Sequence, residues 1–229
     1  MEKKIVISGI RGIPAAHGGF ETFAEYLALY LVKRGWDVTV YCQGEPSQEF
    51  SETTWQNIRL ITIPEKSVGA FGTVRFDFNS IVHSLKRKSL VLTLGYNTAL
   101  FNFFYRVKSI PNIINMDGIE WKRDKWGAVA KTWFWLNEMF GCWFGNHLVA
   151  DHPSIADHLA TRVPREKIET IAYGGLEVLS SDVSLIEPFG LTPGEYAIVI
   201  ARPEPENSLL EIVKGFSSSA RGKKLVVLG

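Results

Sequence analysis

The chain has 229 residues, of which 46% are hydrophobic and 21% charged, so it can bury a core, which excludes a disordered or fibrous protein. Lys and Arg number 25 and Asp and Glu 24, and the net charge of +1 excludes a global positive field for nucleic-acid binding. Cys42 and Cys142 are far apart without zinc-like spacing, which indicates a reducing compartment and predicts no bound metal. The apolar run at residues 5–9 is too short for a signal peptide or a membrane span, so we expect a cytoplasmic protein.

Apolar runs of strand length alternate with segments of helical periodicity in the first three quarters of the chain. The runs are rich in Val, Ile and Leu without strict alternation, which is typical of strands buried on both faces. Apolar spacing predicts helices around residues 20–31 and 133–143. This pattern predicts an α/β fold with a Rossmann-like parallel sheet, helices on both faces, and ligands at the carboxyl ends of the strands. The predicted strands are residues 4–7, 37–41, 58–63, 90–94, 112–116, 147–150 and 167–171.

A change in composition marks the end of the first domain. Between residues 174 and 194 the periodicity stops and Gly, Pro and Ser accumulate, which predicts a linker. Residues 196–201 and 224–229 are predicted strands on either side of a helical run at 209–216. Two strands and one helix are poorly stable alone, so we expect this second Rossmann-like domain to be truncated. The expected organisation is a first domain at 1–175, a linker at 176–194 and the first βαβ unit of an incomplete domain at 195–229.

Two glycines, Gly18 and Gly19, lie at the start of the first predicted helix. Glycines there let a ligand approach the backbone closely, and the unpaired N–H groups of the helix favour an anion, so a phosphate or a sugar edge would fit. A glycine turn that serves only helix–strand packing is the alternative. NAD is not expected, because the spacing is not GxGxxG and the second strand ends at Cys42 and Gln43, where a ribose-binding acid would belong.

The segment 117–126 follows the strand that ends at residue 116 and places carboxylates and cations beside two tryptophans. Tryptophan rings stack on sugars and carboxylates bind hydroxyls, so this composition suits a carbohydrate acceptor. Asp117 comes directly after a buried strand, which makes it the candidate catalytic residue. A solvated helix start is the alternative for Glu120 and Asp124. Asp117 and Glu120 would also be the carboxylate pair of a glycosidase, but a pair three residues apart is equally typical of a helix start.

His152 follows the predicted strand 147–150 and is a candidate substrate contact. A helix cap formed by Asp151 or Ser154 explains the same residues. Both interpretations stay open.

Several motifs in the first domain resemble one known family. Residues 9–14 (Gly-Ile-Arg-Gly-Ile-Pro), 17–22 (His-Gly-Gly-Phe-Glu-Thr), 115–123 and 125–127 are similar to the N-terminal domain of bacterial rhamnosyltransferase-like proteins in the family 4 type of glycosyltransferases. The resemblance implies a GT-B fold, in which two Rossmann-like domains face a cleft. The first domain would bind mainly the acceptor, and the second mainly the nucleotide sugar.

The resemblance also implies roles for individual residues. Gly18 and Gly19 would approach the donor, Asp117 would orient a hydroxyl, and Arg202 would contact the donor diphosphate. Many relatives carry a lysine at the position of Asn207, so donor binding would be weaker or differently organised here. The acidic donor motif of the family would lie beyond Gly229, so this fragment alone would be inactive. The acceptor-side candidates are Glu21, Glu120, Trp121 and His152.

The implied activity is the transfer of a sugar such as rhamnose from a nucleotide-diphosphate sugar to a saccharide acceptor. The resemblance implies a retaining, metal-independent enzyme without a cofactor, acting on a lipid-linked acceptor in cell-surface polysaccharide synthesis. A non-catalytic sugar-binding or assembly module is the alternative, because half of the donor site is missing. An NAD-linked sugar-modifying enzyme is a second alternative.

Tryptophans and basic residues are concentrated in one part of the chain. Five of the seven tryptophans fall within residues 121–143, and residues 101–108 form a second aromatic and basic run. Aromatic rings and cations suit the headgroup layer of a bilayer, so we expect peripheral contact with the inner face of the cell membrane through the 121–126 loop and the 101–108 run. For residues 133–144 a buried helix is the preferred interpretation, because apolar residues occupy most of its circumference.

Overall fold

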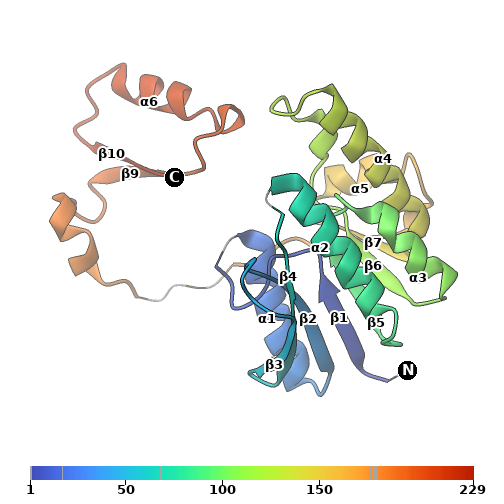
Figure 1. The fold of residues 1–229 in the computed structure, drawn as a ribbon. Coiled ribbons are helices and arrows are strands. Elements are labelled where there is room, and N and C mark those ends of the chain that lie inside the picture. Colours follow the sequence, from blue (N-terminus) through green and yellow to red (C-terminus); the bar gives the residue numbers. More distant parts are fainter. Residues whose placement is uncertain (1, 17, 68, 176, 178–179) are drawn as a thin grey trace. The chain divides into compact units, whose positions relative to one another are not determined.

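The computed structural model describes residues 2–16, 18–67, 69–175, 177 and 180–229. His17 of the glycine motif and positions 176, 178 and 179 of the expected linker lie outside the described residues. The chain forms two compact units (Figure 1). The first contains Met1–Lys122 and Ala128–Tyr173, and the second contains Arg123–Gly127 and Gly174–Gly229.

The first unit is built on an eight-stranded sheet with the order β3-β4-β2-β1-β5-β6-β7-β8. The strands pair in parallel except β3, which is antiparallel to β4. The apolar runs predicted as strands lie in this sheet, so the prediction of an α/β, Rossmann-like fold is confirmed. The strands are β1 (Lys4–Ser8), β2 (Asp37–Gly44), β3 (Ser51–Trp55), β4 (Ile58–Pro64), β5 (Leu90–Leu94), β6 (Asn112–Asn115), β7 (His147–Ala150) and β8 (Ile168–Thr170).

The edge strand β3 is absent from the sequence prediction. Its residues are mainly polar and none of them is buried, so no apolar run marks it. A two-residue turn at Gln56 and Asn57, both with positive φ (49° and 64°), joins it to β4. Two positive φ values are typical of a hairpin turn that matches the twist of the strands. The sheet is therefore mixed, not wholly parallel as expected.

Helices cover both faces of the sheet, as the sequence predicts, but unevenly (Figure 1). On one face, Ile5 and Ile7 of β1 pack with α1. On the other, Val6 packs with α2 and α3. Ile114 of β6 shares this second face by register and packs with α4 and α5. The helices are α1 (Gly19–Lys33), α2 (Gly69–Ser84), α3 (Phe103–Val107), α4 (Ala128–Phe144) and α5 (Pro153–Leu159), with short 3-10 helices at η1 (Ala99–Asn102), η2 (Glu120–Lys122) and η3 (Arg165–Lys167).

The second unit contains the βαβ element that the sequence predicts. Its strands β9 (Tyr196–Ile200) and β10 (Lys224–Leu228) pair in parallel and are connected through α6 (Leu209–Ser217). Three short 3-10 helices, η4 (Val183–Leu185), η5 (Glu187–Phe189) and η6 (Pro205–Asn207), complete it. Within the described residues of both units, no helix has the length and apolar character needed to cross a membrane.

The carboxyl group of Asp77 is buried between α2 and the segment after β5. Asp77 is 8% exposed, and its Oδ2 accepts a hydrogen bond from Thr98 Oγ1 at 2.8 Å. Burial raises the pKa of Asp77 to about 6, although the hydrogen bond from Thr98 opposes this rise. The folded protein therefore binds this proton more tightly than the unfolded chain does.

This raised pKa predicts how stability depends on pH. A folded pKa of about 6 against an ordinary 3.8 means that the contribution of Asp77 to the free energy of unfolding falls as pH rises from about 4 to 6. Asp77→Asn should match the native protein near pH 4 and exceed it at pH 7.5 by on the order of 2 kcal/mol, measured by urea unfolding. The exposed Asp37→Asn variant is the control and should show no such divergence. A loss of stability of the same size at pH 4 and pH 7.5 in Asp77→Asn would contradict the raised pKa of Asp77.

Candidate functional site

The candidate site lies at the carboxyl ends of the central strands of the first unit. β1 pairs with β2 on one side and β5 on the other, so the chain changes direction across the sheet at this point. Such switch points are where open α/β sheets bind ligands. Gly9, which follows β1, has a φ of +83°, and a side chain there would clash with the Leu94 carbonyl at the end of β5. Glycine therefore lets the loops after β1 and β5 approach closely.

The first turn of α1 lies beside the site. Gly18 is the N-cap and supplies no side-chain cap, and a side chain added at Gly19 would meet no atom within 4 Å. The amino end of α1 is therefore open to a ligand. Glu21 is 8% exposed and accepts a hydrogen bond from the backbone N–H of Arg11 at 3.1 Å. Glu21 thus supports the loop before the helix, and its contact with an acceptor stays a prediction.

Asp117 lies directly after β6, as the sequence predicts for a site residue. Its φ of +47° is in the left-handed region, which Asp and Asn tolerate better than most residues. Its backbone N–H donates to Asn115 Oδ1 at 2.9 Å, and the residue is partly exposed. Backbone strain of this kind is concentrated at functional sites, so it supports a role for Asp117 beyond packing.

A buried tyrosine fixes the loop that follows Asp117. The Tyr96 hydroxyl donates to the Gly118 carbonyl at 3.0 Å and accepts from the Glu120 backbone N–H at 2.8 Å. Tyr96 is 1% exposed, and burial raises its pKa far above the ordinary value, so the hydroxyl stays protonated. Glu120 itself is buried, so the alternative of a solvated helix start is wrong for this residue.

The sequence analysis does not single out Tyr173, which brings the site together. Its ring lies 6.3 Å from that of Phe20 and 5.6 Å, edge-on, from that of Phe23, both in α1. Partial burial and the carboxylates of Asp117 and Asp151 together raise the pKa of Tyr173 to about 12, although a hydrogen bond with Asn115 opposes the rise. The hydroxyl is therefore a hydrogen-bond donor at neutral pH. We call Asn115, Asp117, Asp151 and Tyr173 the carboxylate–tyrosine cluster.

Asp151, at the end of β7, has an unsatisfied oxygen. Its Oδ1 is buried and has no hydrogen-bond partner among the described residues. Because buried acceptors are almost always paired, a water or ligand hydroxyl is the expected donor. The neighbouring His152 is exposed and caps α5, since its Nδ1 accepts from the Ser154 N–H at 3.1 Å. The cap is therefore His152 itself, not Asp151 or Ser154, and its contact with substrate stays a prediction.

Trp121 is held from behind by a buried carboxylate. Its Nε1 donates to Glu138 Oε2 at 2.8 Å, and Glu138, on α4, is 1% exposed. The other oxygen of Glu138 contacts His158 Nε2 at 2.8 Å and Arg162 at 2.7 Å. The orientation of the Trp121 ring therefore depends on α4 and α5. Sequence reasoning misses Glu138 because aromatic residues surround it in the chain.

Arg202, the predicted donor contact, belongs to the second unit. It follows β9 and is exposed, and its backbone carbonyl accepts from Asn207 Nδ2 at 2.8 Å. Asn207 therefore ties this loop together in place of the lysine that the resemblance leads one to expect there.

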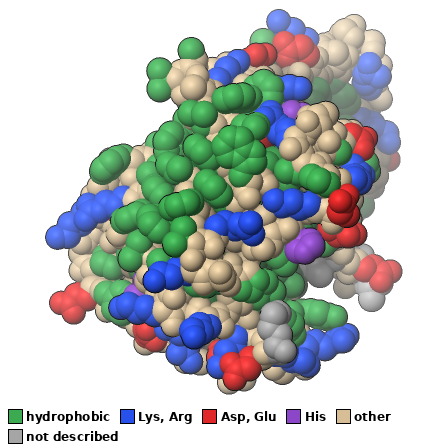
Figure 2. All heavy atoms as spheres, turned by 90° about the vertical axis from the view of Figure 1, so that its right-hand side faces the viewer, with side chains coloured by type: hydrophobic (Ala, Val, Ile, Leu, Met, Phe, Trp, Pro, Cys, Tyr) green, Lys and Arg blue, Asp and Glu red, His purple; other side chains and the backbone are tan. Residues whose placement is uncertain are grey.

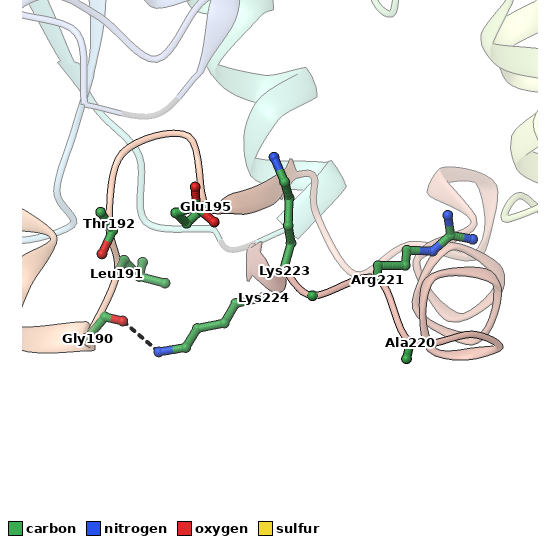
Figure 3. Close-up of a pocket in the computed structure, with 9 residues that line it drawn as sticks. Gly190, Leu191, Thr192, Glu195, Ala220, Arg221, Lys223 and Lys224 are labelled. Carbon is green, nitrogen blue, oxygen red and sulfur yellow. Dashed lines mark hydrogen bonds between the residues drawn. The ribbon is translucent and has the colours of Figure 1, made fainter.

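Figure 3 shows a hollow of about 490 Å³ in the second unit, rich in cationic side chains. It lies at the amino ends of β9 and β10, whereas Arg202 follows the carboxyl end of β9. The three cations point in different directions, and Lys224 Nζ donates to the Gly190 carbonyl at 2.6 Å (Figure 3). Lys223 and Arg221 likewise donate to backbone carbonyls. These cations stabilise loops and do not form an anion site.

No cluster of three or more His, Cys, Asp or Glu suited to a metal ion occurs among the described residues. Residues 2–176 match a protein family described as "Domain of unknown function (DUF1972)". The chain belongs to this family. A comparison with curated proteins finds no match.

Solved structures resemble this DUF1972 protein over its whole length. HepE from Anabaena, in complex with UDP and glucose, superposes with a TM-score of 0.68 at 12% identity, covering 99% of this chain and 60% of HepE. The catalytic domain of starch synthase IV from Arabidopsis thaliana, bound to ADP and acarbose, gives 0.70 at 11% identity, covering 100% and 69%. UDP-N-acetylglucosamine 2-epimerase from Rickettsia bellii gives 0.59 at 13% identity, covering 99% and 62%. The fold is therefore of the GT-B glycosyltransferase-like type, and the chain spans 60% of the length of HepE.

The Tyr96 hydroxyl should control the order of the loop after β6. Tyr96→Phe removes the hydrogen bonds that the hydroxyl makes with the Gly118 carbonyl and the Glu120 N–H, and leaves these two groups only their mutual contact at 3.1 Å. This loss should cost about 1–3 kcal/mol of stability in urea unfolding. Amide hydrogen exchange in residues 117–122 should become faster. Tyr105→Phe is the matched control, since its buried hydroxyl binds Ser84 Oγ at 2.6 Å and should leave that loop unchanged. Equal exchange in both variants would contradict this role.

Proposed function

We propose that the protein is a glycosyltransferase that moves a sugar from a nucleotide-diphosphate sugar to a hydroxyl of a saccharide acceptor. The carboxylate–tyrosine cluster beside the open amino end of α1 carries this proposal, because it joins hydroxyl-binding groups to an anion-binding helix end. The likeness to HepE, solved with UDP and glucose, and to starch synthase IV, solved with ADP and acarbose, supports it. Fold alone does not select the activity, since a 2-epimerase shares it.

In the proposed reaction the acceptor oxygen bonds to the anomeric carbon of the donor while the bond from that carbon to the diphosphate breaks. The nucleoside diphosphate leaves with the electron pair and takes up the acceptor proton, so the configuration is retained without a protein nucleophile. Asp117 accepts a hydrogen bond from the acceptor hydroxyl and orients it. Tyr173 donates to a sugar oxygen beside it. The protein contributes positioning and charge stabilisation.

The remaining candidate residues have supporting roles. The N–H groups after Gly18 and Gly19 face the donor phosphates or the transferring sugar, and the Arg202 guanidinium neutralises the leaving diphosphate through charge-assisted hydrogen bonds. The other acceptor-side residues are Glu21, Glu120, Trp121 and His152. From the sequence resemblance we further propose rhamnose as the sugar and a lipid-linked acceptor in cell-surface polysaccharide synthesis, without a metal or cofactor.

A donor screen with the full-length protein tests this function. UDP-, ADP-, GDP- and dTDP-sugars are each incubated with lipid-linked saccharide acceptors, and nucleoside diphosphate release is measured with and without acceptor. Acceptor-dependent release from one donor supports the proposal. Binding of a donor without release would favour the sugar-binding module instead, and a change in the sugar without acceptor, seen by NMR, would favour an epimerase.

Asp117→Asn tests the role of the carboxylate. Asparagine also tolerates the left-handed conformation, so the loop should keep its shape while the charge is lost. We expect turnover to fall about 100-fold with nucleotide binding unchanged, measured by steady-state kinetics and calorimetry. The exposed Asp157→Asn variant is the control. Native turnover in Asp117→Asn would show that the Asp117 carboxylate has no role in the reaction.

Gly19→Val tests the open helix end. A Cβ added at Gly19 meets no atom of the protein within 4 Å, so a β-branched side chain can be accommodated there and would occupy the space that the ligand needs. We expect at least a tenfold loss of donor or acceptor affinity with a melting temperature close to native. Gly127→Val, before α4, also enters open space and should keep native binding. Undiminished binding by Gly19→Val would show that no ligand approaches this end of α1.

A further inference from the structure

Three helices of the first unit have an unusual distribution of polar and apolar side chains. On α4 the buried residues are Asn137, Glu138, Gly141 and Cys142, whereas Leu136 and Trp143 are 39% and 54% exposed. A surface helix normally buries its apolar side and exposes its polar one. The sequence interpretation of residues 133–144 as a helix is therefore confirmed, but its apolar circumference is not buried throughout. The fully buried residues of the helix are polar or small, Phe134 and Phe140 pack partly buried on the core, and Leu136 and Trp143 face outward.

The same arrangement continues on the neighbouring helices α2 and α3. α2 buries Asp77, Ser80 and Ser84 along with apolar residues and leaves Phe78 39% exposed. On α3 the exposed apolar residues are Phe103 and Val107, at 46% and 61%. We call five of the exposed apolar residues of the three helices the outer aromatic face. It consists of Phe78, Phe103, Val107, Leu136 and Trp143.

Ring contacts connect this face into one surface. From Phe78 on α2 they continue through α3 to Trp143 on α4, with centroid distances between 5.1 and 6.2 Å. Figure 2 looks onto this side and shows the hydrophobic side chains gathered in one broad patch. Isolated apolar residues on a surface need no explanation, but a contiguous patch marks an interaction site. The contacting rings are Phe101, Phe78, Phe104, Phe103, Phe144, Phe140 and Trp143.

On these three helices the charged side chains that reach the solvent are basic. The acidic residues of α2, α3 and α4 are Asp77 and Glu138, and both are buried. The basic residues are Arg75 and Arg106, which are exposed, and Lys131, which is half-buried. Arg75 lies 3.8 Å from the carboxylate of Glu65. The helices that carry the outer aromatic face therefore present cations, and no exposed carboxylate, to the solvent.

We propose that the outer aromatic face docks on the surface of an anionic lipid bilayer. Aromatic and aliphatic side chains suit the boundary between headgroups and acyl chains, and the surrounding cations suit anionic headgroups. A second copy of this chain fits less well, because a two-fold contact would place the same cations opposite each other. The proposal goes beyond the proposed function, since it does not require that the protein transfers a sugar.

The docking residues that we propose from the structure differ from those that the sequence predicts. Trp121 of the 121–126 loop is half-buried and donates its N–H to Glu138, so its polar edge is already engaged. Within the 101–108 run, Phe103 and Val107 are exposed, whereas Tyr105 is buried. Docking thus depends on the helices and not on the loop.

Vesicle sedimentation without nucleotide sugar tests the proposal in the full-length protein. Phosphatidylcholine vesicles are compared with vesicles containing 30% phosphatidylglycerol, at low and high salt. We expect binding to the anionic vesicles at low salt and release at high salt, because salt screens surface charge. Phe103→Ser, Val107→Ser and Trp143→Ser combined should weaken binding at least tenfold. Lys108 is exposed and directly follows α3, so Arg106→Glu with Lys108→Glu should abolish the preference for anionic vesicles.

A matched control lies on the opposite side of the sheet. Tyr26 and Tyr30 on α1 are 51% and 52% exposed, so Tyr26→Ser with Tyr30→Ser removes comparable aromatic surface and should leave binding unchanged. Circular dichroism and melting temperature confirm folding of each variant. Native sedimentation of the Phe103, Val107 and Trp143 variant would overturn the proposal. So would a dimer in analytical ultracentrifugation that the same variant dissociates, since the occupant of the face would then be a second copy.

Discussion

The buried carboxylate of Glu138 makes the interactions on which both the candidate site and the outer aromatic face depend. A carboxylate that is 1% exposed is stable only if its oxygens are satisfied, and here Trp121, His158 and Arg162 satisfy them. This network holds the loop after β6 against α4 and α5. It also fixes the rotation of α4, because the side that carries Glu138 must face inward. Leu136 and Trp143, on another side of α4, then face the solvent.

The candidate site is likewise assembled by supporting residues that do not themselves have to react. Glu21 holds the loop before α1, and Tyr96 holds the loop that carries Asp117. Tyr173 joins the two, since its ring packs on α1 and its hydroxyl lies among the polar groups after β6 and β7. Transfer chemistry without a covalent intermediate depends on such positioning, because small displacements of the reacting groups cost much of the rate.

Sequence predicts those elements of the fold that a single strong pattern specifies. Buried parallel strands need uninterrupted Val, Ile and Leu, so β1 and β5 are evident, and Asp117 is found because it follows such a strand. The polar strand β3 lacks the pattern. In α2 the buried side includes Asp77 and Ser80, so apolar periodicity does not reveal the helix.

The site residues missed from sequence depend on tertiary contacts. Tyr173 stands before Gly174 and Gly175, where composition indicates a linker, and only the ring contacts with α1 reveal its place.

The proposed function and the proposed docking surface are connected by chain order. α4 follows the loop after β6, so its first residue lies on the side of the candidate site, and its 17 residues extend about 25 Å from there. Leu136 and Trp143 of the outer aromatic face lie about 12 and 22 Å along the helix from that end, so a lipid-linked acceptor would have to span this distance from a docked bilayer to the site.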